Sequence, residues 1–133
     1  MTQNMTAPDS QLKISIRILC GDEVAMGPGK ADLLDAIARN GSISGAGRAM
    51  GMSYRRAWLL VDAMNRCWAQ PLVETMAGGA ARSGAQLSNT GHAVLAQYRA
   101  LQAGAGAIDQ GPDWRALQSV LRPAPHNRQH EQE

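Results

Sequence analysis

The stretch from Gly41 to Trp58 reads GSISGAGRAMGMSYRRAW, and its four glycines permit only short helices joined by sharp turns. The small residues Ala46, Gly47 and Ala49 suit a place where two helices cross closely. Gly51 suits a tight turn because it has no side chain to restrict its backbone. The spacing therefore predicts a helix over residues 42–50, a turn at Gly51 and a longer helix over residues 54–69.

A glycine-rich stretch beside arginines also resembles a nucleotide-binding loop, so two classes of protein have to be separated. A dinucleotide-binding loop places its glycines directly after a buried strand, which delivers the pyrophosphate to the next helix. Here Gly45 and Gly47 follow a predicted helix, and Met50 stands where the third glycine would fall. The segment Gly27–Lys30 lacks the spacing and the Ser or Thr of a phosphate loop. The pattern favours a helix-turn-helix over a nucleotide site.

The longer helix has an apolar side and a polar side. At about 100° per residue, the apolar side that we expect in the core contains Ala57, Leu60, Val61, Met64 and Trp68. The roughly opposite side contains Arg55, Leu59, Asp62 and Arg66, with Arg56 and Ala63 beside it. Met50 and Met52 flank the turn and are predicted to plug it with apolar side chains.

Four residues at the start of this helix are the candidate DNA contacts: Ser53, Tyr54, Arg55 and Arg56. The second helix of a helix-turn-helix places its first residues in the major groove of DNA. Arginine suits this position because its planar guanidinium pairs with guanine O6 and N7 or with a phosphate. Two simpler interpretations stay open: the two arginines form a solvated helix end, and Tyr54 is a core ring with an exposed hydroxyl.

Two predicted strands precede the pair of helices. Residues 12–19 alternate between apolar and polar and predict a half-buried strand, and residues 24–26 predict a short return strand. An apolar stripe over residues 30–40, ended by Asn40-Gly41, predicts the helix that follows.

A hairpin and further helices are predicted after the pair. Strands over 72–76 and 85–87 flank a loop of glycines and alanines at 77–84. Ser88 is predicted to cap the next helix, and Gly104 and Gly106 are predicted to interrupt it. The side of this helix that is expected to pack contains Leu87, Gly91, Val94, Leu95, Tyr98 and Leu101. A last amphipathic stretch, opened by Pro112, carries Trp114, Leu117, Val120 and Leu121. The order predicts an α+β fold: a winged helix-turn-helix with an amino-terminal β-hairpin and carboxy-terminal helices.

The chain is long enough for one compact domain with tails, since domains are commonly about 100–150 residues long. We expect a disordered amino-terminal segment over residues 1–11 and a winged helix-turn-helix over 12–103. Residues 104–122 are predicted to form a helical extension that contributes to a dimer contact. The polar, proline-bearing residues 123–133 are expected to be a disordered tail.

Positive charge is local in this chain, whose formal net charge is only +2. The segment from Arg39 to Arg82 contains six arginines and two acidic residues, Asp62 and Glu74, so its net charge is +4. The rest of the chain has seven basic and nine acidic residues, so its net charge is −2. A local excess of arginine is typical of a surface that binds a polyanion.

Other classes of function find little support. Cys20 and Cys67 are far apart without a CxxC spacing, and the three histidines lie outside any metal or nucleophile spacing, so we expect no metal, no cofactor and no enzyme activity. The first ten residues lack the apolar run of a signal peptide and no long apolar run follows, which predicts a soluble, cytoplasmic protein without a membrane partner.

Several separate motifs occur along the chain: SYRRAW at residues 53–58, the Met64-Asn65 pair, the glycine-rich loop at 77–84 and the LSNTGHAVL stretch that begins at Leu87. In type and spacing they resemble the amino-terminal winged-helix domain of ModE-type molybdate-responsive bacterial transcription regulators. The last stretch also resembles the winged domain of LysR-type regulators. The resemblance covers about residues 12–102.

This resemblance implies a homodimer that binds a palindromic site on double-stranded DNA through the recognition helix and the wing. It assigns Ser53, Tyr54, Arg55 and Arg56 to the major groove and Arg82 to the wing, which lies on the backbone or in the minor groove. Arg39 and Arg48 are further candidates for phosphate contacts. In the family, oxyanion binding belongs to a separate carboxy-terminal region of small β-barrels, which this chain is expected to lack, so no molybdate site or other effector site is assigned.

A second hypothesis belongs to another class of function. The apolar face formed by Trp114, Leu117, Val120 and Leu121 also fits an interaction module that binds a partner protein or antagonises a full-length relative without binding DNA.

Overall fold

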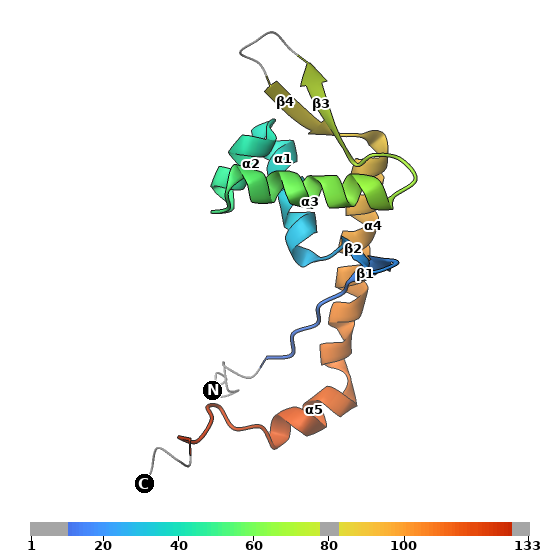
Figure 1. The fold of residues 1–133 in the computed structure, drawn as a ribbon. Coiled ribbons are helices and arrows are strands. Elements are labelled where there is room, and N and C mark those ends of the chain that lie inside the picture. The colour runs from blue at the N-terminus through green and yellow to red at the C-terminus, as the bar shows by residue number, and fades with distance from the viewer. Residues whose placement is uncertain (1–10, 78–82, 129–133) are drawn as a thin grey trace. The chain divides into compact units, whose positions relative to one another are not determined.

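The structure is a computed structural model that describes residues 11–77 and 83–128. Its strands are β1 (Ile18–Cys20), β2 (Glu23–Met26), β3 (Val73–Ala77) and β4 (Ser83–Leu87). Its helices are α1 (Pro28–Asn40), α2 (Ile43–Ala49), α3 (Tyr54–Cys67), α4 (Asn89–Gly106), the 3₁₀ helix η2 (Ala107–Gln110) and α5 (Pro112–Ser119). Figure 1 shows this order, which confirms the predicted α+β winged helix-turn-helix with an amino-terminal hairpin and carboxy-terminal helices.

The described residues divide into two compact units, one within residues 15–102 and one of residues 11–14 with 103–128. The first unit contains the helix-turn-helix, both hairpins and most of α4. None of the helices described is both long and apolar enough to span a lipid bilayer.

The core of the first unit forms where α1, α2 and α3 pack together. Ala57, Val61 and Met64 of α3 are buried, as their helical spacing predicts, and Leu60 and Trp68 pack against the core while partly exposed. Met50 and Met52 also pack against this core, which confirms their predicted role beside the turn. Full burial of a side chain such as Val61 or Met64 stabilises a fold by about 1.5–3 kcal/mol.

The crossing of α2 and α3 depends on Gly47. A Cβ atom at this position would lie 3.3 Å from the Cβ of Ala57 and 3.4 Å from the carbonyl oxygen of Met52, so a larger side chain would force the two helices apart. Gly51 follows with a φ of 71°, a left-handed conformation that glycine adopts without strain. Ser42 caps α2 by accepting a hydrogen bond from the N–H of Gly45 at 2.9 Å.

The amino-terminal hairpin is shorter than the sequence pattern predicts. The alternation over residues 12–19 predicts one long strand, but only Ile18–Cys20 forms β1. The reason is that β2 ends at Met26, which pairs with Ile18, and α1 begins at Pro28, so residues before Ile18 have no strand opposite them. The hydroxyl of Tyr98 instead donates a hydrogen bond to the carbonyl of Ile16 at 2.8 Å and attaches this segment to α4.

The second hairpin is the wing, and it is anchored at its base. Its strands pair in antiparallel register from Val73 opposite Leu87 to Ala77 opposite Ser83. The N–H of Ala85 donates to the carbonyl of Gly41 at 2.9 Å, which joins β4 to the turn between α1 and α2. The wing is therefore held against the helix-turn-helix by a backbone hydrogen bond.

Helix α4 is longer than predicted. Ser88 caps it by accepting from the N–H of Gly91 at 2.9 Å, and the helix continues to Gly106 without the predicted interruption at Gly104. Alanines alternate with these glycines, and the high helix propensity of alanine offsets a cost of about 1 kcal/mol per glycine. Near the other end, a Cβ at Gly91 would overlap the carbonyl oxygen of Leu72, so α4 passes directly against the base of the wing.

Candidate nucleic-acid interface

Helix α3 begins with a side-chain cap that leaves its first turn exposed. The hydroxyl of Ser53 accepts a hydrogen bond from the N–H of Arg56 at 3.0 Å, so it satisfies one of the free donors at the helix start. Tyr54, Arg55 and Arg56 follow in the first turn, and all three are exposed. The sequence-predicted residues of α3 thus lie together at one solvent-facing helix end.

The ion pairs separate two kinds of arginine. Arg66, in the last turn of α3, pairs with Asp62 at 2.9 Å and with Glu23 at 3.4 Å. The hydrogen bond to Asp62, followed by the negative charge of Glu23, raises the pKa of Arg66 above its ordinary value. Arg66 is therefore neutralised within the protein.

Arg99 on α4 is neutralised in the same way. Its guanidinium donates to Asp32 at 2.9 Å and to Asp35, both on α1. The hydrogen bond to Asp35, followed by the one to Asp32, raises the pKa of Arg99. These two clusters engage four carboxylates of the first unit.

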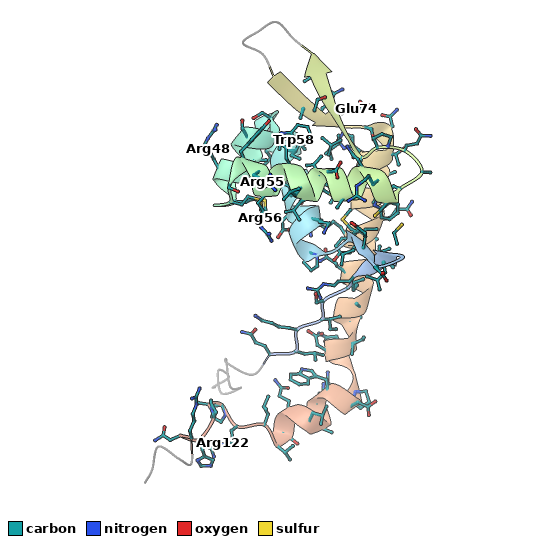
Figure 2. All side chains as sticks on the ribbon, in the orientation of Figure 1. Arg48, Arg55, Arg56, Trp58, Glu74 and Arg122 are labelled. Carbon is teal, nitrogen blue, oxygen red and sulfur yellow. The ribbon has the colours of Figure 1, made fainter. Side chains whose placement is uncertain are left out.

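The arginines at the open end of the helix-turn-helix have no such partners. Within residues 11–77 and 83–128, Arg48, Arg55 and Arg56 have no carboxylate within 4.0 Å. The sequence explains why, because the chain has no acidic residue between Asp35 and Asp62. Figure 2 shows Arg48 on α2 and Arg55 and Arg56 on α3 at the same end of the helix pair.

An aromatic pair lies on the flank of α3 that faces the wing. Tyr54 is 56% exposed and Trp58 is 37% exposed, and their ring centroids lie 6.3 Å apart in an edge-to-face arrangement. The two rings line a groove of about 180 Å³ whose other side is formed by Thr75, Met76 and Gly84 of the wing. Tyr54 is thus a surface ring, which decides against the alternative of a core position.

Trp58 is a residue of the candidate interface that was not among the contacts predicted from the sequence. The apolar stripe of α3 drew attention to the residues that face the core, and Trp58 lies outside that stripe. The signal that points to it is its spacing, since residues at i and i+4 are neighbours on a helix surface and Tyr54 is four positions earlier. Arg82, predicted for the wing tip, lies outside the described residues.

Curated proteins similar to this chain match it over 70–88 residues and confirm the resemblance to ModE-type regulators. The molybdenum-pterin-binding protein MopB of Rhodobacter capsulatus is 45% identical over 83 residues, which are 62% of this chain and 31% of MopB. The molybdenum transport protein ModE of Azotobacter vinelandii is 44% identical over 70 residues, or 53% of this chain and 26% of that protein. The DNA-binding transcriptional dual regulator ModE of Escherichia coli is 32% identical over 88 residues, which are 66% of this chain and 34% of that protein. The chain thus spans about a third or less of the length of these relatives.

A solved structure supports the fold. The chain in a CbnR_DBD–DNA complex superposes with a TM-score of 0.50 and 21% sequence identity, over 67% of this chain and 94% of that one. No protein-family model matches the chain. The shared fold is a winged helix, which is the arrangement that the hairpins and helices above establish from their own geometry.

Proposed function

We propose that this chain binds double-stranded DNA as a sequence-specific transcription regulator of the ModE type, with α3 as its recognition helix in the major groove. The observation that carries the proposal is the absence of carboxylate partners at Arg48, Arg55 and Arg56 among the described residues, while Arg66 and Arg99 each form two ion pairs. Positive groups without protein partners at an exposed helix end are available to phosphates and base edges. The winged-helix fold and the similarity to ModE proteins support the same conclusion.

The residues of the first turn of α3 receive different roles. Arg55 lies opposite the core-facing stripe and is proposed to read a base edge, because a guanidinium pairs with guanine through two hydrogen bonds. Ser53, Tyr54 and Arg56 flank it and position the helix in the groove. Arg48 is proposed to contact a phosphate from the end of α2, and Arg82 to contact the backbone or minor groove from the wing.

The proposed DNA site is palindromic because the active species is proposed to be a homodimer. Two-fold symmetric helix-turn-helix dimers bind half-sites about one helical turn, roughly 34 Å, apart. Residues 104–122 are the proposed dimer contact, and the described side chains of this segment include exposed Leu117 (63%) and Val120 (79%). Association of two copies would remove such apolar surface from water.

The same exposed side chains support a second candidate function. A module that binds a partner protein, or antagonises a full-length regulator, would use Leu117, Val120 and Leu121 without any contact to DNA. The two candidates differ in what they predict at low salt, where electrostatic binding to DNA is strongest.

Selection of bound duplexes from a random DNA pool, followed by fluorescence anisotropy at several salt concentrations, tests the proposal. A palindromic consensus is expected, with a plot of log K against log salt whose slope is about −0.9 for each phosphate neutralised. Light scattering of the protein with and without the selected duplex gives the stoichiometry. A monomer that does not bind any duplex in low salt would reject the proposal and support the interaction module.

A further inference from the structure

A second hollow lies beside the first turn of α3. Its volume is about 250 Å³, and its lining includes three cations from different segments: Arg17 before β1, Lys30 in α1 and Arg56 in α3. Val24, Met52 and Leu60 supply apolar surface to it. All of these residues belong to the compact unit of residues 15–102. We name this hollow the cation cavity.

The cation cavity and the wing groove lie on opposite flanks of α3. Tyr54 and Trp58 line the wing groove, whereas Arg56 and Leu60 line the cation cavity. At about 100° per residue, Arg56 is roughly 200° around the helix from Tyr54, and Arg55 lies between them. A helix that inserts Arg55 into a groove therefore carries the wing on one side and the cation cavity on the other.

The three cations are not neutralised by the protein. Over the described parts of the chain, neither Arg17 nor Lys30 nor Arg56 has a carboxylate within 4.0 Å. The only side-chain hydrogen bond of Arg17 given by the described residues is to the neutral hydroxyl of Ser15, at 3.3 Å. Asp32, on the same helix as Lys30, is engaged by Arg99. Three positive charges gathered around one hollow repel one another unless an anion joins them.

The backbone at this place leaves room for such an anion. A Cβ at Gly27 would lie 3.7 Å from Cγ of Arg17, so the arginine stem runs past the start of α1. A Cβ at Gly29 would meet nothing within 4 Å, which means that the first turn of α1 is open on that side. No acidic residue and no side-chain cap occupies this turn. The backbone thus adds free space to a site that the three side chains define.

We propose that the cation cavity binds a phosphate of the DNA backbone, on the strand that borders the major groove opposite the wing. This inference rests on the proposed function, because α3 must lie in the groove for the cavity to meet that strand. The major groove is about 12 Å wide and is bordered by one backbone on each side. The wing then contacts one border, and Arg17, Lys30 and Arg56 contact the other. Arg17 and Lys30 are phosphate contacts that carry no base preference.

Salt-dependent binding of the selected duplex and of a random duplex tests the assignment. Arg17→Gln and Lys30→Gln should each make the log K against log salt plot less steep, by at most about 1.8, which is about 0.9 for the one phosphate in each half-site of the proposed dimer, and should weaken binding about fivefold or more at 0.15 M salt. Both duplexes should lose affinity by the same factor, because a phosphate contact is blind to sequence. Arg17→Lys should retain most of the wild-type slope of log K against log salt.

Arg66→Gln is the matched control, since it removes a cation that the protein already neutralises. The slope of log K against log salt for Arg66→Gln should stay at the wild-type value. An unchanged slope in both Arg17→Gln and Lys30→Gln, or an equal loss of slope in Arg66→Gln, would overturn the assignment.

A scan with methylphosphonates locates the contact on the duplex. Each phosphate of the selected duplex is replaced in turn by a neutral methylphosphonate, and the affinity of the wild type and of Lys30→Gln is measured. One position in each half-site, outside the wing border, should weaken the wild type and should weaken Lys30→Gln less, because this variant has already lost one of the three cations that contact the phosphate. Additive losses at every position would contradict the assignment.

The outcome also separates this inference from the proposed function. If the wild type binds DNA and Arg55→Ala weakens it while the Arg17 and Lys30 variants do not, the cavity assignment fails alone. If inorganic phosphate shifts the amide signals of Gly29 and Lys30 in the free protein, but the DNA slopes do not change, free phosphate is the ligand and the backbone assignment is wrong. If no duplex binds the wild type, the proposed function and the backbone assignment fail together.

Discussion

The side-chain oxygen of Asn65 accepts a hydrogen bond from the N–H of Leu72 at 2.8 Å. The same oxygen accepts from the N–H of Val73 at 3.1 Å, and the side-chain nitrogen donates to the carbonyl of Val73 at 3.1 Å. One amide near the end of α3 therefore holds the first residues of the wing through three bonds. This amide fixes the position of the wing relative to α3.

Asn65→Ala should lower the free energy of unfolding by about 1–3 kcal/mol, because it leaves partly buried backbone groups without partners. Asn65→Asp should also be destabilising, because its carboxylate retains the acceptor for Leu72 and Val73 but places a second oxygen against the carbonyl oxygen of Val73, which repels it. Urea unfolding followed by circular dichroism measures both. Asn40→Ala is the control, because the Asn40 side chain makes a single hydrogen bond within the described residues, to the carbonyl of Ala36. Equal decreases in the free energy of unfolding for Asn40→Ala and Asn65→Ala would show that the three hydrogen bonds of Asn65 stabilise the fold no more than the single bond of Asn40.

Gly91→Ala should destabilise the fold by about 3 kcal/mol or more, because the new Cβ overlaps the carbonyl oxygen of Leu72 and α4 must move away from the wing. Gly104→Ala on the same helix is the matched control, since a Cβ there meets nothing within 4 Å. That variant should be more stable than the wild type by about 0.5–1 kcal/mol. Thermal unfolding of the two variants should therefore shift in opposite directions, and shifts of the same sign would disprove this account of α4.

Burial raises the pKa of Tyr98 above its ordinary value of about 10. The folded state then binds the phenolic proton more tightly than the unfolded state does, so this contribution to stability is fully present below about pH 10 and is lost as the pH rises through the folded pKa. Tyr98→Phe should show a smaller decline in the urea midpoint between pH 8 and pH 11. At pH 7 it should be about 1 kcal/mol less stable, because the bond to Ile16 is gone. Tyr54→Phe leaves Tyr98 in place and should show the same alkaline decline of the urea midpoint as the wild type. A smaller decline in Tyr54→Phe would show that Tyr98 is not the cause.

Arg55→Ala should weaken binding to the selected duplex by about 1–3 kcal/mol per half-site and relax the preference at one base pair of each half-site, if Arg55 reads a base edge as proposed. Arg66→Ala removes the same charge from the other end of α3, where Asp62 and Glu23 already neutralise it, and should change the affinity by less than about twofold. Anisotropy titrations against duplexes with single base changes measure both effects. A preference that stays the same at every base pair in Arg55→Ala would remove this residue from base recognition.

The sequence predicted the helix-turn-helix well because its signals are local. The apolar stripe of α3, the caps at Ser42 and Ser53 and the turn at Gly51 all depend on residues within a few positions of one another. The first strand was predicted too long, because alternation cannot show that a partner strand ends at Met26.

Only part of the candidate site could be predicted from the sequence. The exposed arginines at the start of α3 could be placed by helical spacing alone. Whether an arginine is neutralised can depend on distant residues: Arg99 is 67 positions from Asp32 and 64 from Asp35. Arg17 and Lys30 meet Arg56 only after folding brings three segments together, so no local pattern could have joined them.

The close approach of α2 and α3 at Gly47 has a thermodynamic consequence. The angle between these helices has little freedom to adjust, so the pair meets a ligand as one rigid body and loses little conformational entropy on association. The heat capacity change on binding should then reflect the buried surface alone, without the large contribution of a segment that folds on its target.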